Sequence, residues 1–124
     1  MIDSLNLGKY IYSSLKEVTN NVYPLVADNN VKFPFLVYRR ANLVSQSNKD
    51  GYVEDTVVME IVAVSDTYKN SIDLISKVRQ QLEHQEKEFD DLVINDAYIT
   101  MATEEYSNNA FVQKIQITFN VNKN

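Results

Sequence analysis

Apolar and polar side chains alternate along the C-terminal end of the chain, and this alternation restricts the possible fold more than any other feature. The apolar positions are Phe111, Ile115, Ile117, Phe119 and Val121, separated by mostly polar residues. A period of two is typical of a strand with one buried face. The segment from Val93 to Tyr106 is equally strand-like, and the Asn108-Asn109 pair between the two tolerates the positive φ angles of a tight turn. The chain is therefore expected to end in a β-hairpin that packs one face on a core.

Two other segments have the helical period. Between Ser4 and Asn20, apolar residues recur at spacings of three and four, and Asp3 or Ser4 is placed to cap the first turn. Asp66 or Thr67 is placed to cap a second helix. The positions expected to be buried are Leu7, Ile11, Leu15 and Val18 in the first helix and Tyr68, Ile72, Ile75, Val78 and Leu82 in the second. Both helices are expected to be amphipathic.

Three further strands are expected between the two helices. Residues 22–27 predict a short edge strand, because Pro24 has no N–H to donate to a ladder. The β-branched and aromatic content of residues 35–44 predicts a second strand. The third runs from Tyr52 to Ser65, and its expected core face carries Val57, Met59, Ile61 and Ala63.

The order of these elements is α-β-β-β-α-β-β, which predicts an α+β fold with a mostly antiparallel sheet and two helices packed on one face. The charged run from His84 to Asp91 is expected to be an irregular connection. With 124 residues, the chain is long enough to bury a core as a single domain over 1–124. Its N-terminal segment carries polar residues at every turn, so neither a signal peptide nor a membrane span is expected.

The residue types that catalysis and cofactor binding require are scarce. The chain has two glycines, one histidine and no cysteine, so it lacks the glycine-rich loops that hold nucleotide phosphates and the ligands of a zinc–thiolate site. A calcium loop over residues 46–57 fails, because Val57 stands where a bidentate carboxylate is needed. Neighbouring carboxylates such as Glu54 and Asp55 point to opposite faces of a strand and cannot share a proton. We expect no enzymatic activity, no cofactor and no metal.

Arg39 and Arg40 are the charged residues of most interest, because adjacent residues in a strand place one guanidinium on each face of the sheet. Glu54 or Glu60, on the next antiparallel strand, is a candidate partner within the chain. A carboxylate of a neighbouring subunit is the other candidate, because bidentate pairs fix orientation at interfaces. Both alternatives remain open from the sequence.

The segment from Ser45 to Gly51 is the most polar in the first half of the chain and ends in the turn pair Asp50-Gly51, which predicts a long hairpin tip. Such a tip can act as an arm that contacts a partner. The residues expected at an interface are therefore Arg39, Arg40, Ser45, Asn48, Lys49, Asp50, Glu54 and Glu60.

The whole pattern resembles a known family. An amphipathic N-terminal helix is followed by VYPLVA, PFLVYRR, the long strand TVVMEIVAVS, the crossover helix SIDLISKVRQQLE and the alternating hairpin. This order is similar to that of the small tail-completion, or tail-to-head joining, proteins of long-tailed bacteriophages, which are related in fold to tail terminators. The resemblance extends from about Leu7 to Val121.

The resemblance implies a non-enzymatic virion protein at the head–tail junction, made in the bacterial host cytoplasm. It implies a homo-oligomeric ring, typically a hexamer, that contacts tail-tube and head-connector proteins, with DNA only as cargo through its lumen. The balance of 17 acidic to 12 basic residues suits a lumen that repels DNA. The alternative interpretation is a small α+β adaptor domain, monomeric or dimeric, that binds a protein partner on the same sheet. The number of subunits separates the two.

Overall fold

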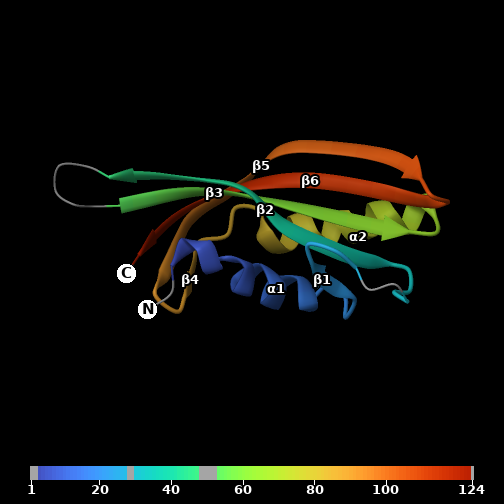
Figure 1. The fold of residues 1–124 in the computed structure, drawn as a ribbon, viewed down its shortest axis with the longest axis horizontal. Helices are drawn as coiled ribbons and strands as arrows, with labels where there is room; N and C mark the ends of the chain where they lie inside the picture. The colour runs from blue at the N-terminus through green and yellow to red at the C-terminus, as the bar shows by residue number, and fades with distance from the viewer. Residues whose placement is uncertain (1–2, 28–29, 48–52, 124) are drawn as a thin grey trace.

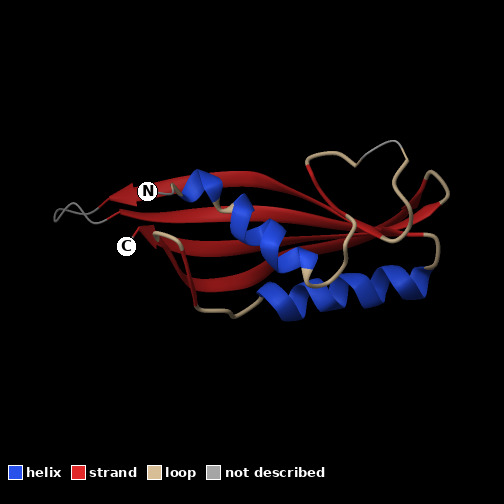
Figure 2. Ribbon diagram, turned by 90° about the horizontal axis from the view of Figure 1, so that it is seen from below, coloured by secondary structure: helices blue, strands red, loops and turns tan. Residues whose placement is uncertain are grey.

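The computed structural model describes residues 3–27, 30–47 and 53–123. In these residues six strands form one twisted sheet in the order β1-β2-β3-β6-β5-β4, and both helices lie on the same face of it (Figure 1, Figure 2). The elements are a 3-10 turn at Ser4–Asn6, α1 Gly8–Lys16, β1 Val22–Pro24, β2 Phe35–Ser47, β3 Val53–Ser65, α2 Tyr68–Leu82, β4 Lys87–Phe89, β5 Leu92–Ser107 and β6 Ala110–Lys123. The pairing of β1 with β2 is parallel, and the other four pairings are antiparallel. The prediction of a mostly antiparallel sheet with two helices on one face is confirmed.

Side-chain caps mark the start of the 3-10 turn and of α2, whereas α1 begins at Gly8 without a side-chain cap. The Asp3 carboxylate accepts a hydrogen bond from the Leu5 N–H at 2.9 Å and starts the 3-10 turn that leads into α1. The Thr67 hydroxyl accepts one from the Asn70 N–H at 3.2 Å and caps α2. These bonds satisfy N–H groups that a helix start otherwise leaves without a partner. Asp3 and Thr67 were both among the predicted capping residues.

The core lies between the helices and the sheet face that they cover. The predicted core residues of the sheet are buried, including Phe119 of β6, except Phe111, which is half-buried. Leu7, Ile11 and Leu15, near or in α1, are buried as well, whereas Val18 is half-buried. In α2 the predicted stripe is correct at Ile75, Val78 and Leu82 but wrong at its start, where Tyr68 is 49% exposed and Leu74 is buried instead. The Tyr68 ring packs edge-on against Phe111, with ring centroids 6.0 Å apart, at the end of the sheet.

The connection between α2 and β5 differs from the prediction. Residues 84–91, expected to be irregular, contain β4, which pairs antiparallel with the start of β5. The turn between the two strands places Asp90 at a φ of 52°. Because β4 has three residues and packs only Phe89 against the core, it shows no alternation that the sequence could reveal. The order is therefore α-β-β-β-α-β-β-β, one strand more than predicted.

Two long hairpins extend towards opposite ends of the molecule (Figure 1). At one end, β2 and β3 pair up to Ser47 and Val53. At the other end, β5 and β6 are joined by Asn108 and Asn109, whose φ angles are 53° and 62°. The prediction that this Asn-Asn pair adopts positive φ angles in a tight turn is confirmed.

Candidate assembly surface

The strands alternate between a helix-covered face and a helix-free face. On β6, Ile117 and Phe119 point to the covered face and are fully buried, whereas Gln116 and Lys114 point to the free face and are half-buried. In the part of the chain that the structure describes, no helix crosses the free face (Figure 2). This face is thus a broad surface of polar and β-branched side chains that none of the described helices covers.

A bidentate ion pair lies at the centre of the helix-free face. Arg39 Nε donates to Glu60 Oε1 at 3.0 Å, and its Nη2 donates to Oε2 at 3.3 Å. Gln116 Nε2 donates to Oε2 as well, at 3.2 Å. Burial pushes the pKa of Glu60 upward, but the hydrogen bonds from Arg39 and Gln116 and the charges of Arg39 and Lys114 outweigh it, so the pKa lies below its usual value. Glu60 is therefore held as a carboxylate that orients Arg39.

Of the two alternatives for Arg39, the partner within the chain is the one observed. Glu60 pairs with it across the β2–β3 ladder, whereas Glu54 lies six residues earlier in β3, opposite Gln46. Gln116 was not among the residues predicted to lie at this surface. Gln116 becomes identifiable only from the β3–β6 register, which pairs it with Glu60. That register was not deduced from the sequence. An additional role of Arg39 or Glu60 between subunits stays a prediction.

Arg40 points to the opposite face, as the alternation predicts. Its Nη1 donates to the Leu5 carbonyl oxygen at 3.0 Å and thereby joins the 3-10 turn to β2. Ser45, predicted to begin a loop, is instead an exposed residue within β2, so this strand is longer than expected. The predicted interface residues Asn48, Lys49 and Asp50 lie outside the described residues.

The carboxylates of Glu54 and Asp55 point to opposite faces of β3, as predicted. Glu54 is half-buried on the helix-free face, whereas Asp55 is only 6% exposed on the covered face. Among the described residues, Asp55 Oδ1 has no hydrogen-bond partner. The two carboxyl groups therefore do not form the close pair that acid–base catalysis uses.

An apolar hollow of about 460 Å³ lies where β2 begins and β3 ends. The aromatic rings of Phe33 and Phe35 stack beside it, with centroids 6.0 Å apart and planes inclined by 18°. Val64 and Val112 continue the apolar lining on the helix-free face. Phe33 is 46% exposed, so this end of the face offers apolar area to a partner.

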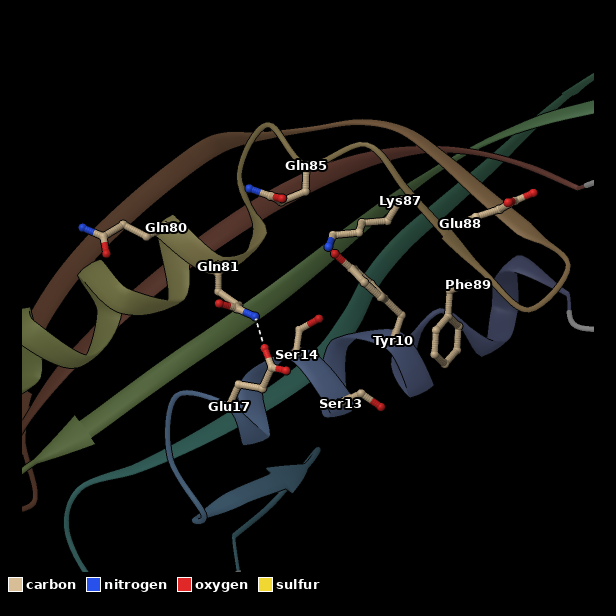
Figure 3. Close-up of a pocket in the computed structure, with 10 residues that line it drawn as sticks. All are labelled: Tyr10, Ser13, Ser14, Glu17, Gln80, Gln81, Gln85, Lys87, Glu88 and Phe89. Carbon is tan, nitrogen blue, oxygen red and sulfur yellow. Dashed lines mark hydrogen bonds between the residues drawn. The ribbon is translucent and has the colours of Figure 1, made fainter.

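A second groove, of about 370 Å³, separates α1 from the connection between α2 and β4 (Figure 3). Its lining is mostly amide and hydroxyl groups, and the Gln81 amide donates to the Glu17 carboxylate across it. Burial raises the pKa of Tyr10, whose ring lies 5.8 Å from that of Phe89. The ten lining residues include neither histidine nor cysteine. The groove can exchange hydrogen bonds with a polar group, but it presents no His- or Cys-based nucleophile.

Residues 3–27, 30–47 and 53–123 present neither a metal-binding cluster nor a membrane-spanning helix. In these ranges, no cluster of three or more His, Asp or Glu side chains is arranged to hold a metal ion. Over the same ranges, no helix combines the length and the apolar character that crossing a membrane requires.

Comparison with known proteins gives a structural match without a sequence match. No protein-family model matches the chain, and no curated protein matches it. Among solved structures 22 chains match, including one from the virion of a native gene transfer agent (GTA) particle. That match covers 91% of this chain and 90% of the other, with a TM-score of 0.71 and 12% sequence identity. The chain therefore shares its fold with a component of a gene transfer agent virion.

Proposed function

We propose that this chain is a structural protein of a phage-like particle, and that it forms a ring at the head–tail junction that completes the tail and joins it to the head connector. The observation that carries the proposal is the fold match over nine-tenths of both chains with a virion component. At 12% identity the likeness is one of fold, so the place in the particle and the ring are the proposed part.

The surface of the molecule supports an assembly role. A ring needs two different surfaces on each subunit that fit each other, and the chain offers a helix-free sheet face and two hairpins at opposite ends (Figure 1). The Arg39–Glu60 pair fixes side chains on that face before any partner arrives, which lowers the entropy cost of association. In this role the chain performs no catalysis and binds no cofactor.

DNA passes through the proposed ring as cargo. The formal charge of the chain is −5, and an excess of acidic residues weakens attraction between a lumen wall and the phosphate backbone. A wall of this kind lets DNA move without holding it.

The ring is tested by light scattering on size-separated protein, alone and then mixed with the cognate tail-tube protein. We expect a species several times the 14.3 kDa mass of the chain in at least one of the two samples. A monomer or dimer that ignores tail-tube protein contradicts the ring and favours the adaptor interpretation.

The position in the particle is tested by deleting the gene for this chain from the genome that encodes the particle. Electron microscopy is then expected to show full heads and separate tails, and expression of the full chain in trans should restore joined particles. Joined particles in the absence of the chain would overturn the proposal.

A further inference from the structure

At each edge of the sheet, a short outer strand pairs with only three residues of the long strand beside it. β1 pairs with β2 at Leu36–Tyr38, and β4 pairs with β5 at Leu92–Ile94. β2 continues to Ser47 and β5 continues to Ser107. Over the described residues, no further strand pairs with either continuation. Open strand edges of this kind are templates for pairing with another chain.

Part of the β5 edge is closed by the end of α2. The Ile99 N–H donates to the Glu83 carboxylate at 3.0 Å, and the His84 N–H donates to the Ala97 carbonyl oxygen at 2.6 Å. The open part of β5 therefore begins after Ile99. Here the side chains of residues 102–107 are exposed on both faces of the sheet. We call residues 101–107 the β5 arm.

The open edge of β2 begins at Arg40, beside an apolar groove. The groove has a volume of about 250 Å³ and lies between the 3-10 turn and the end of β1. Leu5 and Leu25 line it and are 55% and 69% exposed. A strand laid on β2 beyond Tyr38 would follow the line of β1 into this groove and cover both leucines. We call residues 40–46 the β2 edge.

The two edges carry opposite charges. β2 contains Arg39 and Arg40 and no acidic residue, whereas residues 97–107 of β5 contain Glu104 and Glu105 and no basic residue. Opposite charges favour the encounter of the two edges, and like charges oppose pairing of either edge with a copy of itself. The complementary occupant of the β2 edge is thus the β5 arm of a second copy.

The strand directions agree with this pairing. β2, β3, β6 and β5 are successive antiparallel neighbours, so β2 and β5 run in opposite directions. Copies related by rotation about an axis along the strands keep the same orientation, so β2 of one copy meets β5 of the next as an antiparallel neighbour. A ring built in this way leaves no long strand edge open.

The register of the sheet also agrees. Within one chain, Arg39 pairs with Glu60, Glu60 with Gln116, and Gln116 with Met101. Arg39 of β2 and Met101 of β5 therefore lie at the same height along the strands. Closing a sheet into a ring requires a stagger, about one residue per strand in eight-stranded barrels. Applied to the four long strands of each copy, this stagger brings Glu104 opposite Arg40.

We infer that the β5 arm of one copy adds to the β2 edge of the next as an antiparallel strand, and that this contact closes the ring. The inference rests on the proposed ring, because it names the two edges by which neighbouring subunits of that ring join. The Arg39 and Arg40 side of one subunit then faces the Glu104 and Glu105 side of its neighbour.

Engineered disulfides test the contact, since the chain contains no cysteine. Asn42 and Thr103 are exposed on the helix-free face and stand opposite each other in the staggered register. The variant carrying Asn42→Cys and Thr103→Cys is oxidised and run on a non-reducing gel. A second variant, with Val44→Cys and Thr103→Cys, covers a register shifted by two residues. We expect one of them to give a ladder of covalent multimers that ends at the size of the ring and disappears with reductant.

The matched control carries Asn42→Cys and Ser76→Cys, which places the second thiol on the exposed side of α2. It is expected to give at least tenfold less multimer. Circular dichroism melts of all variants show that they fold. The single variant Asn42→Cys is expected to run as a monomer on the non-reducing gel; a covalent dimer from it would show pairing of β2 with itself and overturn the inference.

The remaining outcomes separate the contact from the ring. A ring in light scattering without a ladder from either pair overturns the edge contact and leaves the proposed function standing. A ladder that continues without end supports the edge contact and contradicts a closed ring. Monomeric protein without cross-links, even with tail-tube protein present, overturns both.

Discussion

The two faces of the sheet are made by the same strands, but the side chains of one face are buried in an apolar core and those of the other form polar contacts. On the helix-covered face, Phe119 and Ile117 are fully buried under the helices. One residue away on the same strand, Gln116 and Thr118 bond to polar neighbours of adjacent strands. The covered face therefore provides most of the free energy of folding through apolar burial. The free face, whose side chains are mostly half-buried, buries less apolar area, and it is the face that we propose for assembly.

Neighbouring residues of β6 give the strongest test of this comparison. Phe119→Ala removes a fully buried ring that packs edge-on against Tyr10 at 6.5 Å, so the free energy of unfolding should fall by about 3–5 kcal/mol. Thr118→Ala, on the free face, should lower it by about 1 kcal/mol or less. Urea denaturation measures both. Equal losses at the two positions would show that the free face also belongs to a packed core.

The turn between β5 and β6 decides which side chains go to which face, because a shift of one residue reverses every position. Asn108 has a φ of 53°, which a β-branched residue adopts only under strain. Asn108→Val should therefore lower the free energy of unfolding by about 1–3 kcal/mol. The control Asn108→Gly, which removes the strain, should change it by less than about 0.5 kcal/mol. Similar losses from both, in urea denaturation, would contradict the positive φ.

The ion pair on the free face should contribute to stability in a pH-dependent way. The pKa of Glu60 is lower in the folded chain than its ordinary value of 4.5, so its contribution is present above that value and is lost as the pH falls through the folded pKa. At pH 7, Glu60→Gln should lower the free energy of unfolding by about 1 kcal/mol, a modest figure because Arg39 is half-exposed.

Urea midpoints at pH 7 and pH 3 measure this dependence. The difference between the wild-type chain and the Glu60→Gln variant should shrink as the pH is lowered below 4.5. Arg39→Gln removes the same pair from its other member and should weaken the pH dependence as well. A difference that is the same at both pH values would mean that the carboxylate is not stabilised by its neighbours.

The sequence predicted the features that repeat along the chain. The alternation around Val57 and Phe119 and the helical period around Ile75 depend only on local spacing, and all three residues are buried as expected. Features that depend on contacts between distant segments were missed. β4 has no periodicity of its own and forms only because β5 lies beside it. Tyr68 is exposed because the sheet extends past the core at the start of α2.

The candidate surface was predictable to the same extent. Alternation placed Arg39 and Arg40 on opposite faces, but their partners, Glu60 and the Leu5 carbonyl, depend on the register of β2 and on where the 3-10 turn packs. The open strand edges could not be predicted from the sequence for the same reason. Where pairing stops depends on the lengths of β1 and β4, which only the structure shows. Sequence patterns predict on which face of the sheet a residue lies, whereas the strand order determines which strand edge remains unpaired.

The smallest expected effect on stability lies at the β2 edge and separates folding from assembly. Val44 is 46% exposed on the helix-free face, so Val44→Lys should change the free energy of unfolding by less than about 0.5 kcal/mol. A lysine on an edge strand opposes pairing with another chain, so the same variant should give smaller oligomers in light scattering. The control Lys9→Gln, on the exposed side of α1, should alter neither quantity. If Val44→Lys destabilises the monomer by more than 1 kcal/mol, the β2 edge belongs to the fold. If the variant assembles as the wild-type chain does, that edge is not used between subunits.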